Sequence, residues 1–199
     1  GVKMKLGHED PRIDIQRVTE VRKALGDDIW ITTDANQKWD YPTAMMVGRE
    51  LEQLNVAWFE EPLWCDDIPG HARLADDLDI PIAMGETLGS RYEFDAYIRA
   101  DAADILQPDI CRVGGITEMI KIVHIGQVAG KPIAPHHMME STIQVACGVM
   151  SSGPIEYMPW VSSAFSEPMR IEDGQMFPPQ KPGLGLEIPE NVIQKYRIE

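Results

Sequence analysis

Six ionisable residues recur along the chain at intervals close to the length of one strand-helix unit. Each comes at the end of a short apolar segment, where a polar side chain is unusual, and successive members are 20 to 27 residues apart. They are Asp34, Glu60, Glu86, Asp109, His136 and Glu156. A single Asp at a strand end is usually a helix N-cap. Six in series instead predict a shared site, because the carboxyl ends of parallel barrel strands meet at one mouth, where barrel enzymes keep their active sites.

Three of the carboxylates fall on consecutive predicted strands and form a candidate metal site. Asp34, Glu60 and Glu86 would repel one another strongly unless a cation lay among them. Oxygen ligands without Cys or His indicate a hard cation, and Mg²⁺ fits best. Either Glu60 or Glu61 could be the second ligand. The spacing favours Glu60, and the other carboxylate is then expected to brace a neighbouring cation.

Basic groups occur towards both ends of this series. Lys3 and Lys5 share one face of the first predicted strand, because side chains alternate along a strand. Two adjacent buried ammonium groups lower each other's pKa, which makes a lysine usable as a base near neutral pH. An exposed strand start with solvated lysines is the alternative. His136 could exchange a proton from the opposite side, with Asp109 fixing its tautomer, although a purely structural histidine is also open.

Short β-branched segments alternate with amphipathic helical patterns almost to the end of the chain. The predicted strands cover residues 2–6, 29–34, 56–60, 80–84, 105–109, 131–135 and 155–157. The predicted helices cover residues 11–25, 41–54, 70–78, 91–99, 117–129 and 141–150, with a short final helix near 190–196. This alternation predicts right-handed βαβ units in a parallel sheet, either doubly wound or closed as a (β/α)8-type barrel. The sequence contains no GxGxxG or GxxxxGK[ST] motif, which disfavours the nucleotide-binding versions.

The composition excludes several other classes of protein. The chain has 18 Lys and Arg against 32 Asp and Glu, and its formal net charge of −14 disfavours a nucleic-acid partner. Apolar residues make up 44%, enough for a sizeable core, yet no apolar run approaches the length of a membrane span. The three cysteines are widely spaced, without a CxxC, which indicates free thiols in a reducing compartment. We therefore expect a cytoplasmic protein without a membrane partner.

A set of short motifs follows in an order that is highly specific in combination. The motifs are Lys3-Met4-Lys5, Thr33-Asp34-Ala35-Asn36-Gln37, Phe59-Glu60-Glu61-Pro62, Met84-Gly85-Glu86, Gln107-Pro108-Asp109 with Gly114-Gly115, His136 and Glu156. Together they resemble the mandelate racemase and muconate lactonizing enzyme group of the enolase superfamily. The resemblance implies an α/β fold, a TIM-like (β/α)7β barrel capped by a separate α+β domain. Residues 1–158 would be the C-terminal part of the barrel and 159–199 a proline-rich tail returning toward the cap, with the first barrel strand and the cap before residue 1.

The resemblance also implies a reaction, the Mg²⁺-assisted abstraction of a proton α to a carboxylate to give an enediolate. Such a carbon acid is far too weak for a side-chain base unless the developing charge is stabilised as it forms. A divalent ion held by the carboxylates would supply that stabilisation. In this scheme Lys5 resembles the base on one face of the substrate, and Lys3 resembles its modulating neighbour.

The remaining roles follow from the same resemblance. His136 with Asp109 resembles the acid/base on the opposite face, and the spacing from Asp109 favours His136 over His137. Glu156 resembles a protonated carboxyl that donates to the substrate carboxylate. Asn36 resembles a polar contact near the metal and the substrate.

Three functions remain open at this point. Opposed bases permit loss of a β-hydroxyl, and the resemblance favours dehydration of a sugar acid, a small-molecule hydroxylated mono- or dicarboxylate, to a 2-keto-3-deoxy acid. They also permit a 1,1-proton transfer, as in a racemase or epimerase of a 2-hydroxy acid. A catalytically silent barrel that binds a metabolite is the alternative of another class. The resemblance further implies a homo-oligomer.

Overall fold

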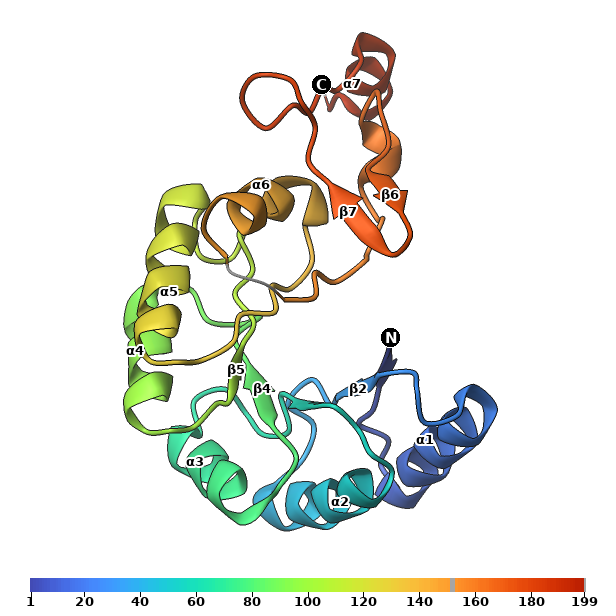
Figure 1. The fold of residues 1–199 in the computed structure, drawn as a ribbon, viewed down its shortest axis with the longest axis vertical. Helices are drawn as coiled ribbons and strands as arrows, with labels where there is room; N and C mark the ends of the chain where they lie inside the picture. Colours follow the sequence, from blue (N-terminus) through green and yellow to red (C-terminus); the bar gives the residue numbers. More distant parts are fainter. Residues whose placement is uncertain (151–152, 199) are drawn as a thin grey trace.

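The chain forms an arc of parallel strands with helices along its outer side (Figure 1). The computed structural model describes residues 1–150 and 153–198. Five strands pair in chain order and run parallel to one another. They are β1 (Val2–Lys5), β2 (Ile31–Asp34), β3 (Phe59–Glu60), β4 (Ile82–Met84) and β5 (Ile105–Leu106). This order and direction confirm the predicted succession of βαβ units.

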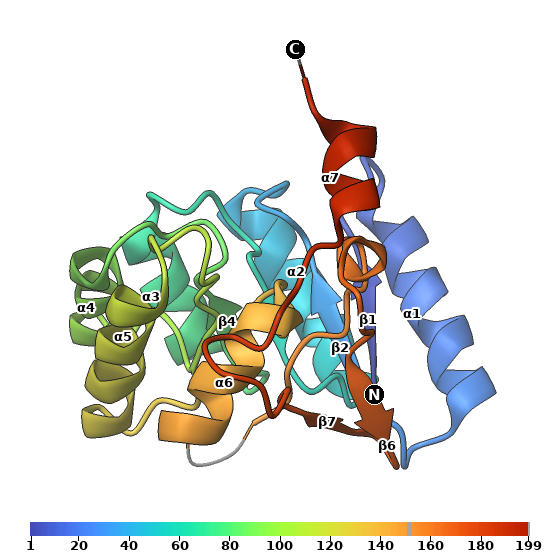
Figure 2. The same ribbon diagram turned by 90° about the horizontal axis from the view of Figure 1, so that it is seen from above.

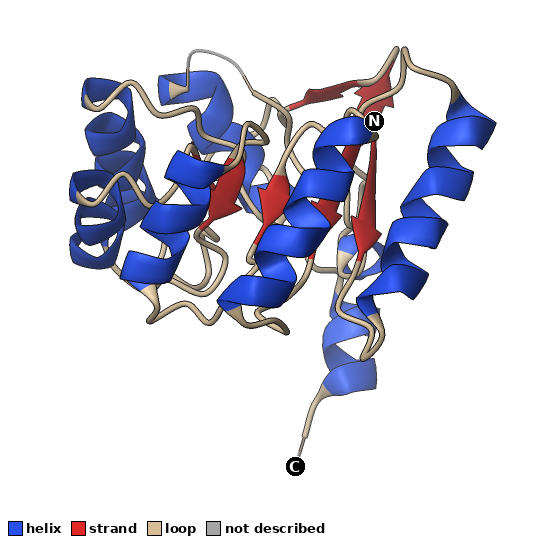
Figure 3. Ribbon diagram, turned by 90° about the horizontal axis from the view of Figure 1, so that it is seen from below, coloured by secondary structure: helices blue, strands red, loops and turns tan. Residues whose placement is uncertain are grey.

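The helices form the outer layer of the arc in Figure 1, and Figure 3 shows several of them in front of the strands. They are α1 (Pro11–Leu25), α2 (Tyr41–Gln53), α3 (Ile68–Asp77), α4 (Arg91–Arg99), α5 (Ile116–Val128) and α6 (Met139–Val149). The first three begin in the same way: Asp10, Asp40 and Asp67 each accept a hydrogen bond from a backbone amide two or three residues further on, and a proline occupies the first or second helical position. An aspartate cap followed by proline is a strong local start signal, because it satisfies a free amide and presets the helical φ.

Beyond β5 the sheet continues only as isolated parallel bridges, which join Leu106 to Ile133 and Asp109 to His136. The strand predicted at 131–135 is therefore not formed as a continuous element. Two prolines within it remove the backbone amide donors that a regular ladder needs. The bridge between Asp109 and His136 nevertheless brings these two residues side by side.

The C-terminal segment differs from its prediction in two respects. Residues 155–157 are not in a strand, and an antiparallel hairpin of β6 (Arg170–Glu172) and β7 (Gln175–Phe177) replaces the expected plain tail. A 3-10 turn, η1 (Ser162–Ala164), precedes the hairpin, and α7 (Glu190–Tyr196) confirms the short final helix. This helix extends away from the rest of the molecule (Figure 2).

Two clusters of buried apolar side chains fill the space between strands and helices. The first packs α1, α2 and α3 against β2–β4, and includes Val18, Leu51 and Phe59. The second surrounds β4 and β5 beneath α4, α5 and α6, and includes Phe94 and Leu106. All five of these side chains are fully buried. This close packing fixes the strands, and with them the residues at their carboxyl ends. Within the described ranges, no helix is both long and apolar enough to cross a membrane.

His71 is a buried histidine within α3, away from the strand ends. Its Nδ1 donates to the carbonyl oxygen of Asp67 over 3.0 Å, and its Nε2 has no hydrogen-bond partner among the described residues. Burial lowers the pKa of His71 below its ordinary value of 6.5. At a pH just below 6.5 the folded protein therefore keeps this ring neutral, whereas the unfolded chain would protonate it.

The first prediction concerns acid stability. Because the pKa of His71 is depressed in the folded state, the unfolded chain binds the extra proton, so the free energy of unfolding falls as the pH drops below 6.5 towards the depressed pKa. In His71→Leu, which has no titrating ring, this loss should be shallower between about pH 7 and pH 5. Urea unfolding at a series of pH values measures this free energy for both proteins. Identical pH profiles for wild type and His71→Leu would contradict the depressed pKa of His71.

Candidate active site

Three carboxylates from successive strands come together at the carboxyl ends of the sheet. Asp34 ends β2 and pairs in register with Glu60, which ends β3. Glu86 follows β4 after Gly85, whose φ of +145° and 2.7 Å approach to Phe94 at the Cβ position leave room only for glycine. One oxygen from each of the three carboxylates lies within 4.8 Å of the others. The structure thus brings together the three residues predicted as metal ligands.

The electrostatics of this carboxylate cluster fit a hard divalent cation. Asp34 and Glu60 are fully buried, and burial raises the pKa of Asp34, Glu60 and Glu86, with mutual repulsion adding to the rise. Oε2 of Glu86 is buried and accepts no hydrogen bond from the described residues. An oxygen-only donor set with an unsatisfied oxygen is what Mg²⁺ requires, and the remaining coordination positions of such an ion are usually taken by water or substrate.

The two lysines of β1 contact this cluster. Nζ of Lys3 lies 2.9 Å from Glu60 and 2.6 Å from Glu156, and Nζ of Lys5 contacts the carboxylate of Asp34. Burial alone would lower the pKa of Lys3, but attraction to Glu60 and Glu156 outweighs it and raises this pKa above its ordinary value. The predicted lowering by a neighbouring lysine is therefore wrong for Lys3, because carboxylates, rather than ammonium groups, are its nearest charges. Lys3 stays protonated at neutral pH.

A histidine-aspartate pair lies on the opposite side of the cluster. Nδ1 of His136 lies 2.8 Å from Oδ2 of Asp109, and Nε2 lies 3.3 Å from Oε2 of Glu86. Burial lowers the pKa of His136, but the bond to Asp109 and the charges of Glu86 and Glu156 raise it to a net value above the ordinary one. His137 lies further away, with Nδ1 3.9 Å from Asp109. The structure thus pairs Asp109 with His136, as the spacing predicted.

Glu156 connects the two sides of the site. It contacts Lys3 at 2.6 Å, accepts the backbone amide of His137 at 3.0 Å, and lies 3.8 Å from Nε2 of His136. Burial alone would raise the pKa of Glu156. The charge and hydrogen bond of Lys3 outweigh this effect, so the net pKa lies below the ordinary value. The ion pair with Lys3 therefore favours the ionised form of Glu156 when no substrate is bound, whereas the resemblance implies a protonated carboxyl.

Two further polar residues belong to the cluster. Asn36 donates through Nδ2 to Glu86 over 3.1 Å and through its backbone amide to Asp34 over 2.8 Å, so it lies beside the carboxylate cluster. Glu61 was expected to brace a neighbouring cation, but among the described residues it forms no ion pair. It accepts hydrogen bonds from the neutral side chains of Gln37 and Thr87. Sequence reasoning missed these two partners, although each directly follows a residue assigned to the site.

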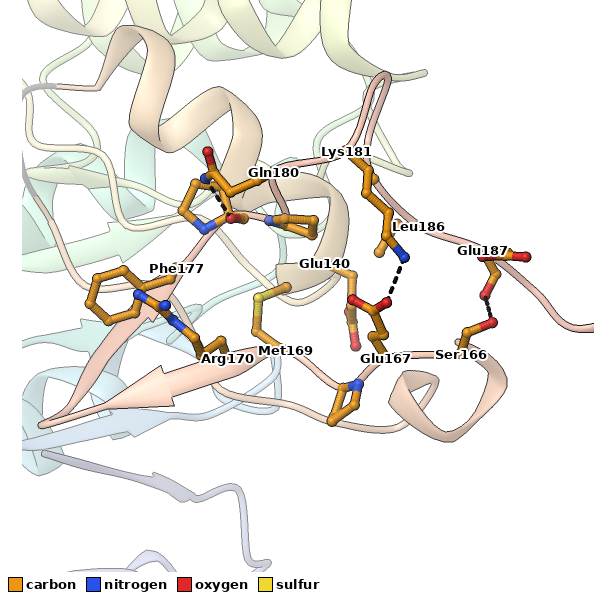
Figure 4. A pocket seen from close by; sticks show the side chains of 14 residues that line it. Glu140, Ser166, Glu167, Met169, Arg170, Phe177, Gln180, Lys181, Leu186 and Glu187 are labelled. Carbon is orange, nitrogen blue, oxygen red and sulfur yellow. Dashed lines mark hydrogen bonds and ion pairs between the residues drawn. The ribbon is translucent and has the colours of Figure 1, made fainter.

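A cavity lies elsewhere, between α6 and the C-terminal segment. It has a volume of about 450 Å³, and Figure 4 shows its side chains, including the ion pair between Lys181 and Glu167 at 2.5 Å. None of the predicted site residues lines it.

Comparison with known proteins shows the family of the chain. The family model described as "Enolase C-terminal domain-like" matches residues 1–192. An L-talarate/galactarate dehydratase from Salmonella typhimurium is 42% identical over 190 residues, which cover 96% of this chain and 48% of that protein. An arabinonate dehydratase from Saccharolobus solfataricus is 34% identical, covering 100% of this chain and 56% of that protein. The chain therefore spans about half the length of the curated relatives it matches.

Solved structures agree on the fold and on the family. An L-talarate dehydratase from a Polaromonas species, solved with Mg and L-glucarate, superposes with a TM-score of 0.92 at 45% identity, covering 98% of this chain and 52% of that one. A racemase from Streptomyces coelicolor with bound magnesium gives a TM-score of 0.94 at 29% identity, over 98% and 54% of the two chains. The chain is thus an α/β barrel segment that belongs to the enolase C-terminal domain-like family, within the mandelate racemase and muconate lactonizing enzyme group of the enolase superfamily.

Proposed function

We propose that this chain provides the catalytic residues of a Mg²⁺-dependent dehydratase that acts on a sugar acid. One observation carries the proposal: a cluster of three carboxylates lies between a lysine pair on one side and a histidine-aspartate pair on the other. The cluster fits a divalent cation, and the flanking groups can move protons on two faces of one bound substrate. A cytoplasmic, homo-oligomeric enzyme remains part of this proposal.

Asp34, Glu60 and Glu86 would hold the Mg²⁺, which when bound supplies positive charge to a substrate carboxylate as negative charge develops on it. Lys5, as its neutral amine, then takes the proton from the carbon α to that carboxylate. Lys3 keeps its own proton, because two carboxylates neutralise it, and acts as a fixed positive charge beside the reacting carbon.

His136 acts as the acid on the opposite face. Its raised pKa keeps the ring protonated over a wider pH range, which suits a proton donor to a leaving hydroxyl group. Asp109 holds Nδ1 of the ring, so that Nε2 is the reacting nitrogen. The α C–H bond and the β C–O bond break, water leaves, and the resulting enol tautomerises to a 2-keto-3-deoxy acid.

The names of the relatives support a substrate class. The 42% identical relative is named for L-talarate and galactarate, which are hydroxylated six-carbon diacids. We therefore propose a sugar diacid as the substrate. A racemase or epimerase is the second candidate, because the same two opposed groups could remove and return one proton, and relatives at about 29% identity include racemases.

A second prediction tests the metal site. Adding Mg²⁺ to the metal-free protein should raise its Tm, because a ligand present at a hundredfold excess over its Kd stabilises the folded state by about 2.7 kcal/mol. Glu86→Gln should lose most of this rise, since it removes one anionic ligand, whereas Glu118→Gln on the outer helix α5 should keep it. Thermal unfolding with and without EDTA measures the effect. A Glu86→Gln variant that responds to Mg²⁺ like the wild type would contradict the ligand assignment.

A third prediction separates the two proton-transfer groups. Lys5→Met should lose both dehydration and exchange of the α-proton with deuterated water, whereas His136→Asn should lose dehydration by about 10²–10⁴-fold and keep some exchange. NMR of candidate sugar diacids incubated with enzyme and Mg²⁺ follows both readouts. Wild-type exchange without any 2-keto-3-deoxy product would favour the racemase instead. Full turnover by both variants would contradict the roles of Lys5 and His136, and a wild type with neither exchange nor product would favour the silent barrel.

A further inference from the structure

Glu61 lies behind the carboxylate cluster and is only 1% exposed. Its side chain accepts a hydrogen bond from Nε2 of Gln37 over 3.1 Å and from Oγ1 of Thr87 over 2.8 Å. Its backbone amide donates to Ala83 on β4 over 3.0 Å, and its carbonyl accepts from the amide of Gln37 over 2.8 Å. One residue after β3 is thus bonded to the segments that follow the strands on both sides.

The residues bonded to Glu61 adjoin Glu86, a proposed metal ligand, and Asn36, which contacts Glu86. Gln37 follows Asn36, which donates to Glu86 over 3.1 Å, and Thr87 directly follows Glu86. Oε1 of Gln37 also accepts the backbone amide of Cys65 over 2.9 Å, which adds the loop after β3 to the same network. A movement of Glu61 would therefore be transmitted to both ends of the bond between Asn36 and Glu86.

The backbone at this network is held in an unfavourable conformation. Asn36, Gln37 and Glu61 have φ values of 44°, 64° and 42°, in the left-handed region that residues with a Cβ rarely adopt. Such conformations persist only where surrounding contacts over-determine them, and they cluster at functional sites. Here the main-chain and side-chain bonds between Gln37 and Glu61 supply those contacts, since they link two of the three residues directly.

We propose that Glu61 is a positioning residue, which sets the affinity for Mg²⁺ by holding the loops after β2 and β4 in register with Glu60. The inference rests on the proposed function, because it assumes that Asp34, Glu60 and Glu86 bind the metal. Glu61 acts through Gln37 and Thr87, and its hydrogen bonds, rather than its negative charge, are what the site requires.

Substitutions at this position can separate the geometry from the charge. In Glu61→Gln the amide oxygen can still accept from Gln37, while the amide nitrogen donates to Thr87, whose hydroxyl turns from donor to acceptor. This variant keeps both hydrogen bonds and loses the charge. Glu61→Ala loses the two hydrogen bonds as well as the charge. Glu140 offers a matched control, because it is a carboxylate that is also 1% exposed, on α6, where it bonds to Ser162 instead of the metal cluster.

The fourth prediction is tested by Mg²⁺ binding to the intact protein, measured by calorimetry and by competition with Mn²⁺ in electron paramagnetic resonance. Glu61→Ala should raise the Kd by about 10–100-fold, the usual effect of removing a group that orients metal ligands. Glu61→Gln should stay close to the wild type. Glu140→Ala should lower the Tm and leave the Kd for Mg²⁺ unchanged. Thr87→Val and Gln37→Leu each remove one bond to Glu61, and Gln37→Leu also removes the bond to the amide of Cys65. Both should weaken binding less than Glu61→Ala, and they keep the test available if that variant does not fold.

Three results would overturn the inference. The first is a Kd for Glu61→Ala, or for both single-bond variants, equal to that of the wild type. The second is a Glu61→Gln variant as weak as Glu61→Ala, which would assign the effect to charge. The third is an equal loss in Glu140→Ala, which would assign it to general destabilisation. In all three the wild type binds Mg²⁺, so the proposed function survives. A wild type that binds no Mg²⁺ overturns the proposed function itself.

Discussion

Repulsion between buried carboxylates is the constraint on which the rest of the structure depends. The register of the parallel sheet holds Asp34 beside Glu60, and Glu86 follows the end of the adjacent strand β4, so the backbone keeps the three carboxylates close together. Charges buried at this distance need a compensating cation. In the described chain Lys3 and Lys5 supply positive charge from β1. A divalent ion would compensate the charges of the three carboxylates more fully than the two lysines do, and this is the physical basis of the proposed chemistry.

The same constraint explains how the neighbouring residues are arranged. Positive or protonatable groups surround the cluster on both sides, and Glu156 contacts each side, with Lys3 at 2.6 Å and His136 at 3.8 Å. The polar network around Glu61 lies behind the cluster and contributes neutral donors. The flanking groups therefore compensate the negative charge of the carboxylates, whereas the hydrogen-bond network of Glu61 orients the loops that carry them. The helices on the outer side of the arc fix the strands, and thereby hold both the flanking groups and the Glu61 network in place.

Helices were predicted more accurately than strands, for a physical reason. The helix starts at Pro11, Tyr41 and Arg91 and the final helix from Glu190 agree with the prediction, because caps, prolines and the apolar period are local signals. The strands are shorter than predicted, and residues 131–135 form only isolated bridges. A strand exists only where a neighbour offers partners for its backbone, and the sequence of one segment does not contain that information.

The sequence by itself determined which residues meet. A period of one βα unit was enough to predict that Asp34, Glu60 and Glu86 converge and that Asp109 pairs with His136, because parallel strands place their carboxyl ends together. Only the tertiary structure decided the charge states and the supporting contacts. The protonated Lys3 depends on distances between residues far apart in the chain, as do the ionised Glu156 and the network of Glu61. Electrostatic interactions vary with those distances, and spacing along the sequence does not fix them.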